Sequence, residues 1–293
     1  MAALMCSATW VHPTHGVTKC GQCMECRLAY SREWAIRITH EAQMHDHNCF
    51  LTLTYDNDNL PLHGQLVKKD LQDFFKRLRH VTGPFRYVAS GEYGELKRRP
   101  HFHVALFGVD FHEDRIDFGA GIRGDKTFVS PTVASVWQKS VFPMGHTIGS
   151  LTFESAAYIA RYITKKVTGK NICPVPLWSD PDTGEMVLPN PEFLVCSRGI
   201  GKAWFRDYFM SDVFPHARVI TAQGSPAPVP RYYKNLLKEV GADLAMEMSY
   251  RASVNMDRDL DRRKVEDLPS RRSARAVYAK ARTGLFKRDV KEI

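Results

Sequence analysis

The chain has 293 residues, with 41 Lys and Arg against 32 Asp and Glu and a formal net charge of +9. This length can bury a full hydrophobic core, and 44% hydrophobic with 25% charged residues is typical of a globular protein. No apolar stretch reaches the roughly 18 residues of a membrane span, and the N-terminus lacks the pattern of a secretory signal. We therefore expect no membrane partner, and the positive charge favours a polyanionic one.

The spacing of apolar residues predicts the regular elements in chain order. Residues 49–55 alternate as in a strand, whereas residues 69–81 place their apolar side chains on one side of a helix. The patterns predict helices at 24–45, 69–81, 132–140, 155–167, 200–209 and 230–249, and strands at 49–55, 85–90, 101–109 and 146–153. Residues 169–191 contain five prolines and should form a long loop. This order predicts an α+β fold with helices packed on one face of an antiparallel sheet.

Composition divides the chain into three expected regions. Residues 1–48 form a Cys-rich segment and a helix, 49–215 a core domain, and 216–293 a basic, mainly helical extension. From Arg251 onward the chain has 13 Lys and Arg against 7 Asp and Glu, so this segment carries six of the nine excess charges. It is either a solvated charged tail or an electrostatic grip on a phosphate backbone.

Two histidines share one face of a predicted strand. His101 and His103 are two residues apart, so both imidazoles point the same way. Glu92 ends the preceding strand and can come alongside across a hairpin, with Glu95 in reserve. Two histidines and one carboxylate can hold a divalent ion and leave open positions for substrate oxygens.

The predicted helix at 155–167 carries tyrosines and lysines away from its apolar stripe. Tyr158, Tyr162, Lys165 and Lys166 fall within about 100° of one another at 100° per residue. The apolar stripe consists of Ala156, Ile159, Ala160, Ile163 and Val167. A tyrosine hydroxyl aligned with a lysine suits nucleophilic attack at phosphorus. The alternative is that the tyrosines only fill core.

Other candidates are weaker. Cys20, Cys23 and Cys26 offer three thiolates, and Cys6 could complete a zinc site, with His12 or His15 behind it; simple reduced cysteines are the alternative. Lys97, Arg98 and Arg99 adjoin the histidines and could contact DNA. Thr52 and Thr54 share a strand face near substrate, while Phe50, Leu51 and Leu53 should be core. Trp137, Trp178 and Trp204 could stack on unpaired bases, although burial is the main expectation.

Three motifs in order resemble those of HUH endonucleases, the initiators of rolling-circle replication. They are FLTLTY at 50–55, PHFHV at 100–104 and AYIARYITKK at 157–166. GEYG at 91–94, the early cysteines and SRGIG at 197–201 are similar to the microvirus (gokushovirus-like) branch, from small phages with circular single-stranded DNA. The resemblance covers most of residues 6–235. It implies an HUH fold with an RRM-like antiparallel core between flanking helices.

The resemblance also implies an activity and its residues. His101, His103 and Glu92 would bind Mg²⁺ or Mn²⁺, and Tyr158 and Tyr162 would be paired nucleophiles, with Tyr162 and Lys165 the better-supported pair. The expected partners are a single-stranded DNA origin and host helicase and polymerase, in the bacterial host cytoplasm. The chain has no Walker A motif, so a helicase must come from elsewhere. The alternative is a non-catalytic single-stranded nucleic-acid-binding module with a zinc knuckle. A relaxase or transposase is disfavoured by the position and pairing of the tyrosines.

Overall fold

The computed structural model describes residues 6–14, 16–94, 98–121, 124–165, 177–179, 183–221, 224–257 and 264–284. The chain forms two compact units. One unit combines the residues up to Met44 with those from Gly199 onward, and the other is His45–Arg198. Among the helices of the described ranges, none has the length and apolar character needed to cross a bilayer.

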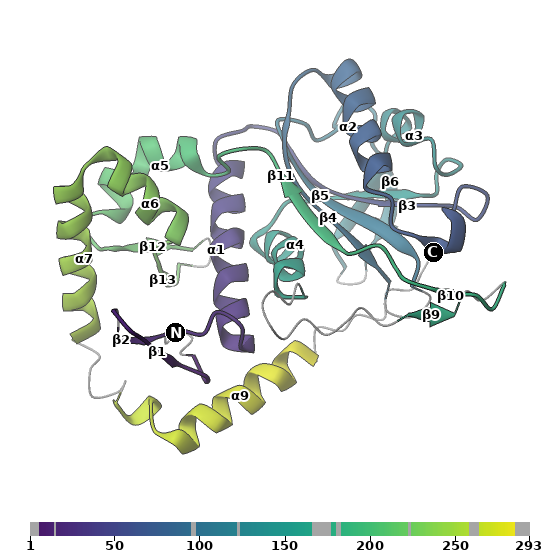
Figure 1. The fold of residues 1–293 in the computed structure, drawn as a ribbon. Helices are drawn as coiled ribbons and strands as arrows, with labels where there is room; N and C mark the ends of the chain where they lie inside the picture. The colour runs from purple at the N-terminus through teal and green to yellow at the C-terminus, as the bar shows by residue number, and fades with distance from the viewer. Residues whose placement is uncertain are drawn as a thin grey trace. The chain divides into compact units, whose positions relative to one another are not determined.

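An antiparallel sheet forms the centre of the unit His45–Arg198 (Figure 1). Within the described residues it has seven strands in the order β11-β4-β5-β3-β8-β7-β6. The strands are β3 (Asn48–Thr54), β4 (Arg86–Tyr93), β5 (Pro100–Phe107), β6 (Ile116–Ala120), β7 (Lys126–Val129), β8 (His146–Gly149) and β11 (Phe193–Cys196). The four predicted strands are confirmed, and the sheet bears out the predicted α+β class. The sequence patterns missed β6, β7 and β11, which are short and lie towards the edges.

One face of this sheet holds the hydrophobic core, under α2 (Lys68–Thr82) and α3 (Pro131–Trp137). Period-two alternation sends Phe102, Val104 and Leu106 of β5 to this face, where each is 0% exposed. The apolar side of α2 covers them, as its spacing predicts; its buried residues are Leu71, Phe74, Phe75 and Leu78. Phe50 of β3 was expected in this core, but it lies on the opposite face with the histidines.

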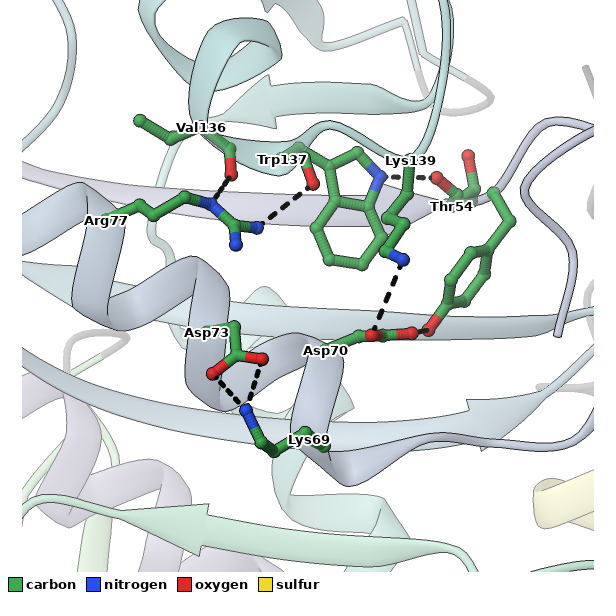
Figure 2. Close-up of polar contacts among 9 residues, drawn as sticks. Thr54, Lys69, Asp70, Asp73, Arg77, Val136, Trp137 and Lys139 are labelled. Atoms are coloured by element: carbon green, nitrogen blue, oxygen red, sulfur yellow. Dashed lines mark hydrogen bonds and ion pairs between the residues drawn. The ribbon is translucent and has the colours of Figure 1, made fainter.

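A group of polar contacts fastens the end of β3 to this helical layer (Figure 2). The indole Nε1 of Trp137 donates to the carbonyl oxygen of Thr54 at 2.6 Å, and the ring is 0% exposed. Arg77 of α2 donates to the carbonyl oxygens of Val136 and Trp137, at 2.7 and 3.3 Å, and so closes the end of α3. Burial is therefore confirmed for Trp137. Its role is to hold the strand beside the histidines from behind.

The helix with the tyrosines, α4 (Phe153–Lys165), lies on the other face of the sheet, where it contacts β4, β5 and β11 (Figure 1). Its buried residues Ala156, Ile159 and Ala160 are each 0% exposed, as the apolar stripe predicts. The expectation that helices pack on one face only is therefore wrong. The reason is that Phe50 and the partly apolar histidine face also need cover from water.

The edge of the sheet next to β4 requires a glycine. A Cβ atom at Gly91 would lie 2.8 Å from the ring of Phe193 on β11, closer than side chains pack. The proline-rich stretch before β11 was expected to be loop throughout. It instead contains a small hairpin of β9 (Trp178–Ser179) and β10 (Met186–Val187).

The second unit is mainly helical. Its helices are α1 (Met24–Ala42), α5 (Lys202–Tyr208), the π-helix η2 (Phe209–Val213), α6 (Arg231–Val240), α7 (Ala242–Asp257) and α9 (Pro269–Gly284), with two hairpins, β1 (Trp10–His12) with β2 (Gly16–Thr18) and β12 (Arg218–Ile220) with β13 (Pro226–Pro228). The single helix expected at 230–249 is divided because Gly241 adopts an extended conformation with φ −176°.

The SRGIG motif serves as a packing device in this unit. Arg37 of α1 donates to the carbonyl oxygen of Ile200 at 3.1 and 3.2 Å, and the Gly201 N–H donates to Glu41 at 2.6 Å. Gly201 has φ +78°, and a Cβ there would lie 2.5 Å from the hydroxyl of Tyr233, so only glycine fits. Trp204 stacks on His40 at 3.5 Å between ring centroids and is buried, as expected for that tryptophan.

Candidate metal centre and tyrosine helix

The structure brings Glu92, His101 and His103 together on the sheet face that α4 covers. Glu92 on β4 lies directly opposite His101 on β5, and His103 follows two residues later on the same face. The pairing register, set by the short turn between β4 and β5, thus puts the carboxylate beside both imidazoles. One ligand atom from each residue lies within 4.8 Å of the others.

The carboxylate of Glu92 is the centre of this cluster. Its Oε1 lies 3.0 Å from Nε2 of His101 and 2.8 Å from Nε2 of His103. Glu92 is 1% exposed and His103 is 8% exposed. Burial raises the pKa of Glu92, but the charge of His103 and the hydrogen bonds of both histidines outweigh it and lower the pKa to about 2. The carboxylate is therefore ionised at neutral pH.

Hydrogen bonds on the far side of each imidazole set how it faces Glu92. Nδ1 of His101 lies 3.1 Å from the carbonyl oxygen of Arg99, which can only accept, so Nδ1 carries the proton. The lone pair of Nε2 then faces the Glu92 carboxylate at 3.0 Å. Two acceptors that close repel unless a proton or a cation lies between them. Nδ1 of His103 is held in the same way by the hydroxyl of Thr52, at 3.1 Å.

This donor set fits a divalent ion. Neighbouring ligand atoms at about 2.1 Å from an octahedral ion lie about 3.0 Å apart, close to the two contacts that Glu92 makes. Backbone carbonyl and hydroxyl partners on the outer nitrogens are what metal-binding histidines usually have. The sequence pattern identified the three central residues but not the roles of Thr52 and the Arg99 carbonyl. Thr52 could have been found from the strand register, since it pairs with His103.

The first of the two predicted tyrosines lies at this cluster. The hydroxyl of Tyr158 donates to Oε1 of Glu92 at 3.3 Å, and its ring stands perpendicular to His103 with centroids 4.8 Å apart. Tyr162 follows one helical turn later on α4. The side chains of Tyr162 and Lys165 and the whole of Lys166 lie outside the described residues.

The basic residues before the histidines have different surroundings. Arg99 donates to the carbonyl oxygen of Tyr55 at 2.8 and 3.2 Å and to Asn57 at 2.8 Å, so its guanidinium holds the start of β5 against the chain that follows β3. Arg98 is exposed, and its guanidinium lies 5.0 Å over the ring of Trp178. Lys97 and Glu95 lie outside the described residues.

The four predicted cysteines also come together, in the other unit. One sulfur from each of Cys6, Cys20, Cys23 and Cys26 lies within 4.8 Å of the others. Burial raises the pKa of the Cys23 and Cys26 thiols. Burial also raises that of Cys20, but backbone N–H groups of Cys23 and Gln22 lower it overall to about 7. Of the alternative ligands, His12 instead contacts Thr14 and His15 lies outside the described residues.

Comparison with known proteins places the chain in a family. Residues 48–167 match the family model of the replication-associated protein ORF2. The chain is 32% identical over 246 residues to replication-associated protein VP4 of Bdellovibrio phage phiMH2K, which covers 81% of this chain and 72% of that protein. It is also 35% identical over 202 residues to replication-associated protein ORF2 of Spiroplasma virus 4, with 64% and 57% covered. The chain belongs to the family of phage replication-associated proteins, of the microvirus-like kind.

A third relative, replication-associated protein ORF4 of Chlamydia phage 1, is 28% identical over 241 residues, 79% of this chain and 56% of that protein. The matched segments thus span less than two thirds of the Spiroplasma and Chlamydia proteins. No solved structure matches the chain.

Proposed function

We propose that this protein is a metal-dependent HUH endonuclease that nicks and rejoins single-stranded DNA at a rolling-circle origin. The observation that carries the proposal is the position of α4: it sets the hydroxyl of Tyr158 3.3 Å from Glu92, beside His101 and His103. A nucleophile within reach of a two-histidine, one-carboxylate cluster is the arrangement that transesterification of a phosphodiester requires. The replication-associated names of the relatives agree with this role.

In the proposed reaction, a tyrosine hydroxyl attacks the scissile phosphorus and the bond to the 3′ oxygen breaks. The tyrosine loses its proton, the 3′ oxygen gains one, and the products are a 5′-phosphotyrosine and a 3′-OH primer. A divalent ion held by Glu92, His101 and His103 would polarise a non-bridging phosphate oxygen. Lys165 would hold the phosphate or stabilise the phenolate. Tyr158 and Tyr162 would take turns, one cutting the origin and the other resolving the completed circle.

The roles of the surrounding residues follow from their contacts. The Arg99 carbonyl and Thr52 orient the imidazoles, while the Trp137 indole and the Arg99 guanidinium fix the backbone at the ends of β3 and β5. These contacts keep the ligand atoms in place before DNA binds, so little reorganisation is needed in the transition state. The 3′-OH would be extended by host polymerase with a host helicase, in the host cytoplasm.

Cleavage of tiled oligonucleotides tests the proposal. We expect the full chain to cut one site among overlapping single-stranded oligonucleotides from the genome that encodes it, with Mg²⁺ or Mn²⁺ and not with EDTA. Denaturing gels would show the cut and, in the same lanes, a slower protein–DNA species. Binding that EDTA leaves intact, with no cut under either metal, would instead support the non-catalytic binding module.

The basic C-terminal segment should supply salt-sensitive grip. Because α9 contacts α1, deleting the segment would damage the unit, so substitution is the cleaner test. We expect Lys264→Gln/Arg271→Gln/Lys280→Gln to flatten the salt dependence of binding by about 2 in log–log slope, at about 0.7 per phosphate contact. Cleavage at low salt should persist.

The matched control removes three exposed charges from α2, Lys68, Lys69 and Lys76, which lies on the sheet face away from the histidines. Its slope should equal that of the unchanged protein. Equal slopes for all three proteins in fluorescence anisotropy titrations would contradict a DNA-gripping role for the C-terminal segment.

A further inference from the structure

The N-terminal segment has little apolar burial to hold it in place. The β1–β2 hairpin forms a two-stranded sheet of its own, and its side chains Trp10 and Val11 are 49% and 72% exposed. A hairpin of this size is only marginally stable by itself in water. The four cysteines lie at its base: Cys6 precedes it, Cys20 follows it, and Cys23 and Cys26 begin α1. Whatever joins these cysteines fastens the segment to α1.

The spacing of the sulfurs is that of ligands around one ion. Sγ of Cys6 lies 3.5 Å from that of Cys20 and 3.7 Å from that of Cys23. Four sulfurs bound at about 2.3 Å to one tetrahedral zinc lie about 3.8 Å apart. A disulfide would require about 2.0 Å, and all four cysteines are free.

The backbone around the sulfurs is arranged for thiolates. The N–H groups of Gln22 and Cys23 both point at Sγ of Cys20, at 3.3 and 3.2 Å, and the N–H of Cys20 points at Sγ of Cys6 at 3.3 Å. Cys23 and Cys26 stand at the N-terminus of the 19-residue helix α1, where the helix dipole favours negative charge. Cys6 and Cys26 are only 3% and 9% exposed, so their thiolates need a cation beside them.

We propose that Cys6, Cys20, Cys23 and Cys26 bind one structural zinc ion that fastens the N-terminal segment to α1. Four thiolates complete a tetrahedral site and leave no position for substrate, so the ion stabilises and does not catalyse. The helix that it anchors also carries Arg37 and Glu41, which hold Ile200 and Gly201 at the start of α5. Zinc binding should therefore stabilise this whole unit.

Metal analysis of the full chain, purified without chelator, tests the proposal. We expect one zinc per chain, and one chain equivalent of Co²⁺ in its place should give the strong visible and near-ultraviolet bands of a tetrahedral thiolate site. Cys20→Ser/Cys23→Ser should lose the zinc and melt at a lower temperature. Cys196→Ser, in the other unit, should keep both zinc and stability.

A further variant separates this site from the proposed catalytic ion. Glu92→Gln/His101→Ala should still contain one zinc, since it leaves all four cysteines in place. If Cys20→Ser/Cys23→Ser fails to fold, the metal content and cobalt spectrum of the unchanged protein still decide. The proposal is wrong if that protein holds no zinc, if the double cysteine variant keeps it, or if non-reduced peptide maps show a disulfide among the four cysteines.

Discussion

Glu92→Gln should lower metal-dependent cleavage at least ~100-fold while leaving the fold intact. The carboxylate is the only anion among the three proposed ligands, and its Oε1 is the atom that both imidazoles and the Tyr158 hydroxyl approach. Losing its charge removes most of the attraction for a divalent ion. The fold should survive because the glutamine amide can donate to Nε2 of His101, whose lone pair faces it.

Two measurements separate metal loss from misfolding. Mn²⁺ should raise the melting temperature of the unchanged protein and not that of Glu92→Gln, since an ion stabilises only the state that binds it. Glu154→Gln, an exposed residue in the first turn of α4, is the matched control and should behave as the unchanged protein. Normal cleavage by Glu92→Gln with Mg²⁺ or Mn²⁺ would rule out the proposed metal centre.

The double variant Tyr158→Phe/Tyr162→Phe should lose cleavage by about 10⁴-fold or more, because no nucleophile remains on α4. Each change removes only a hydroxyl, so the ring contact of Tyr158 with His103 and the helix itself are retained. Each single variant should keep one of the two steps, either origin cleavage or joining of the cut ends. Tyr208→Phe, at a 43% exposed tyrosine outside α4, is the control and should cut normally.

Assays of cleavage and of joining on separate substrates distinguish the two steps. Comparing the two single variants also shows which tyrosine cuts first. Full cleavage by the double variant would contradict the tyrosine mechanism, even if the metal requirement held.

Local patterns were sufficient for the centre of the fold. The alternation in β3 and β5 and the apolar stripes of α2 and α4 each agree with the observed burial, because one face of each element is buried. The hairpin between β4 and β5 is short, so the meeting of Glu92 with His101 could also be foreseen. Such contacts depend on neighbours in sequence or on a single turn.

Contacts between distant segments could not be foreseen. β11 joins β4 from about a hundred residues away, and a four-residue strand carries too little pattern to indicate this pairing. That α4 covers the histidine face depends on the whole sheet order. The role of Arg99 was read from its charge as DNA contact, whereas its guanidinium is engaged by Tyr55 and Asn57, which only the folded chain brings near.

The most direct test of the proposed function is to map the covalent protein–DNA adduct. The full chain would be incubated with the cut oligonucleotide and Mn²⁺, digested with protease and nuclease, and sequenced by tandem mass spectrometry. We expect a 5′-phosphonucleotide on Tyr158 or Tyr162, within the peptide of α4. An adduct on a tyrosine elsewhere, or efficient cleavage with no adduct at any tyrosine, would contradict the proposal.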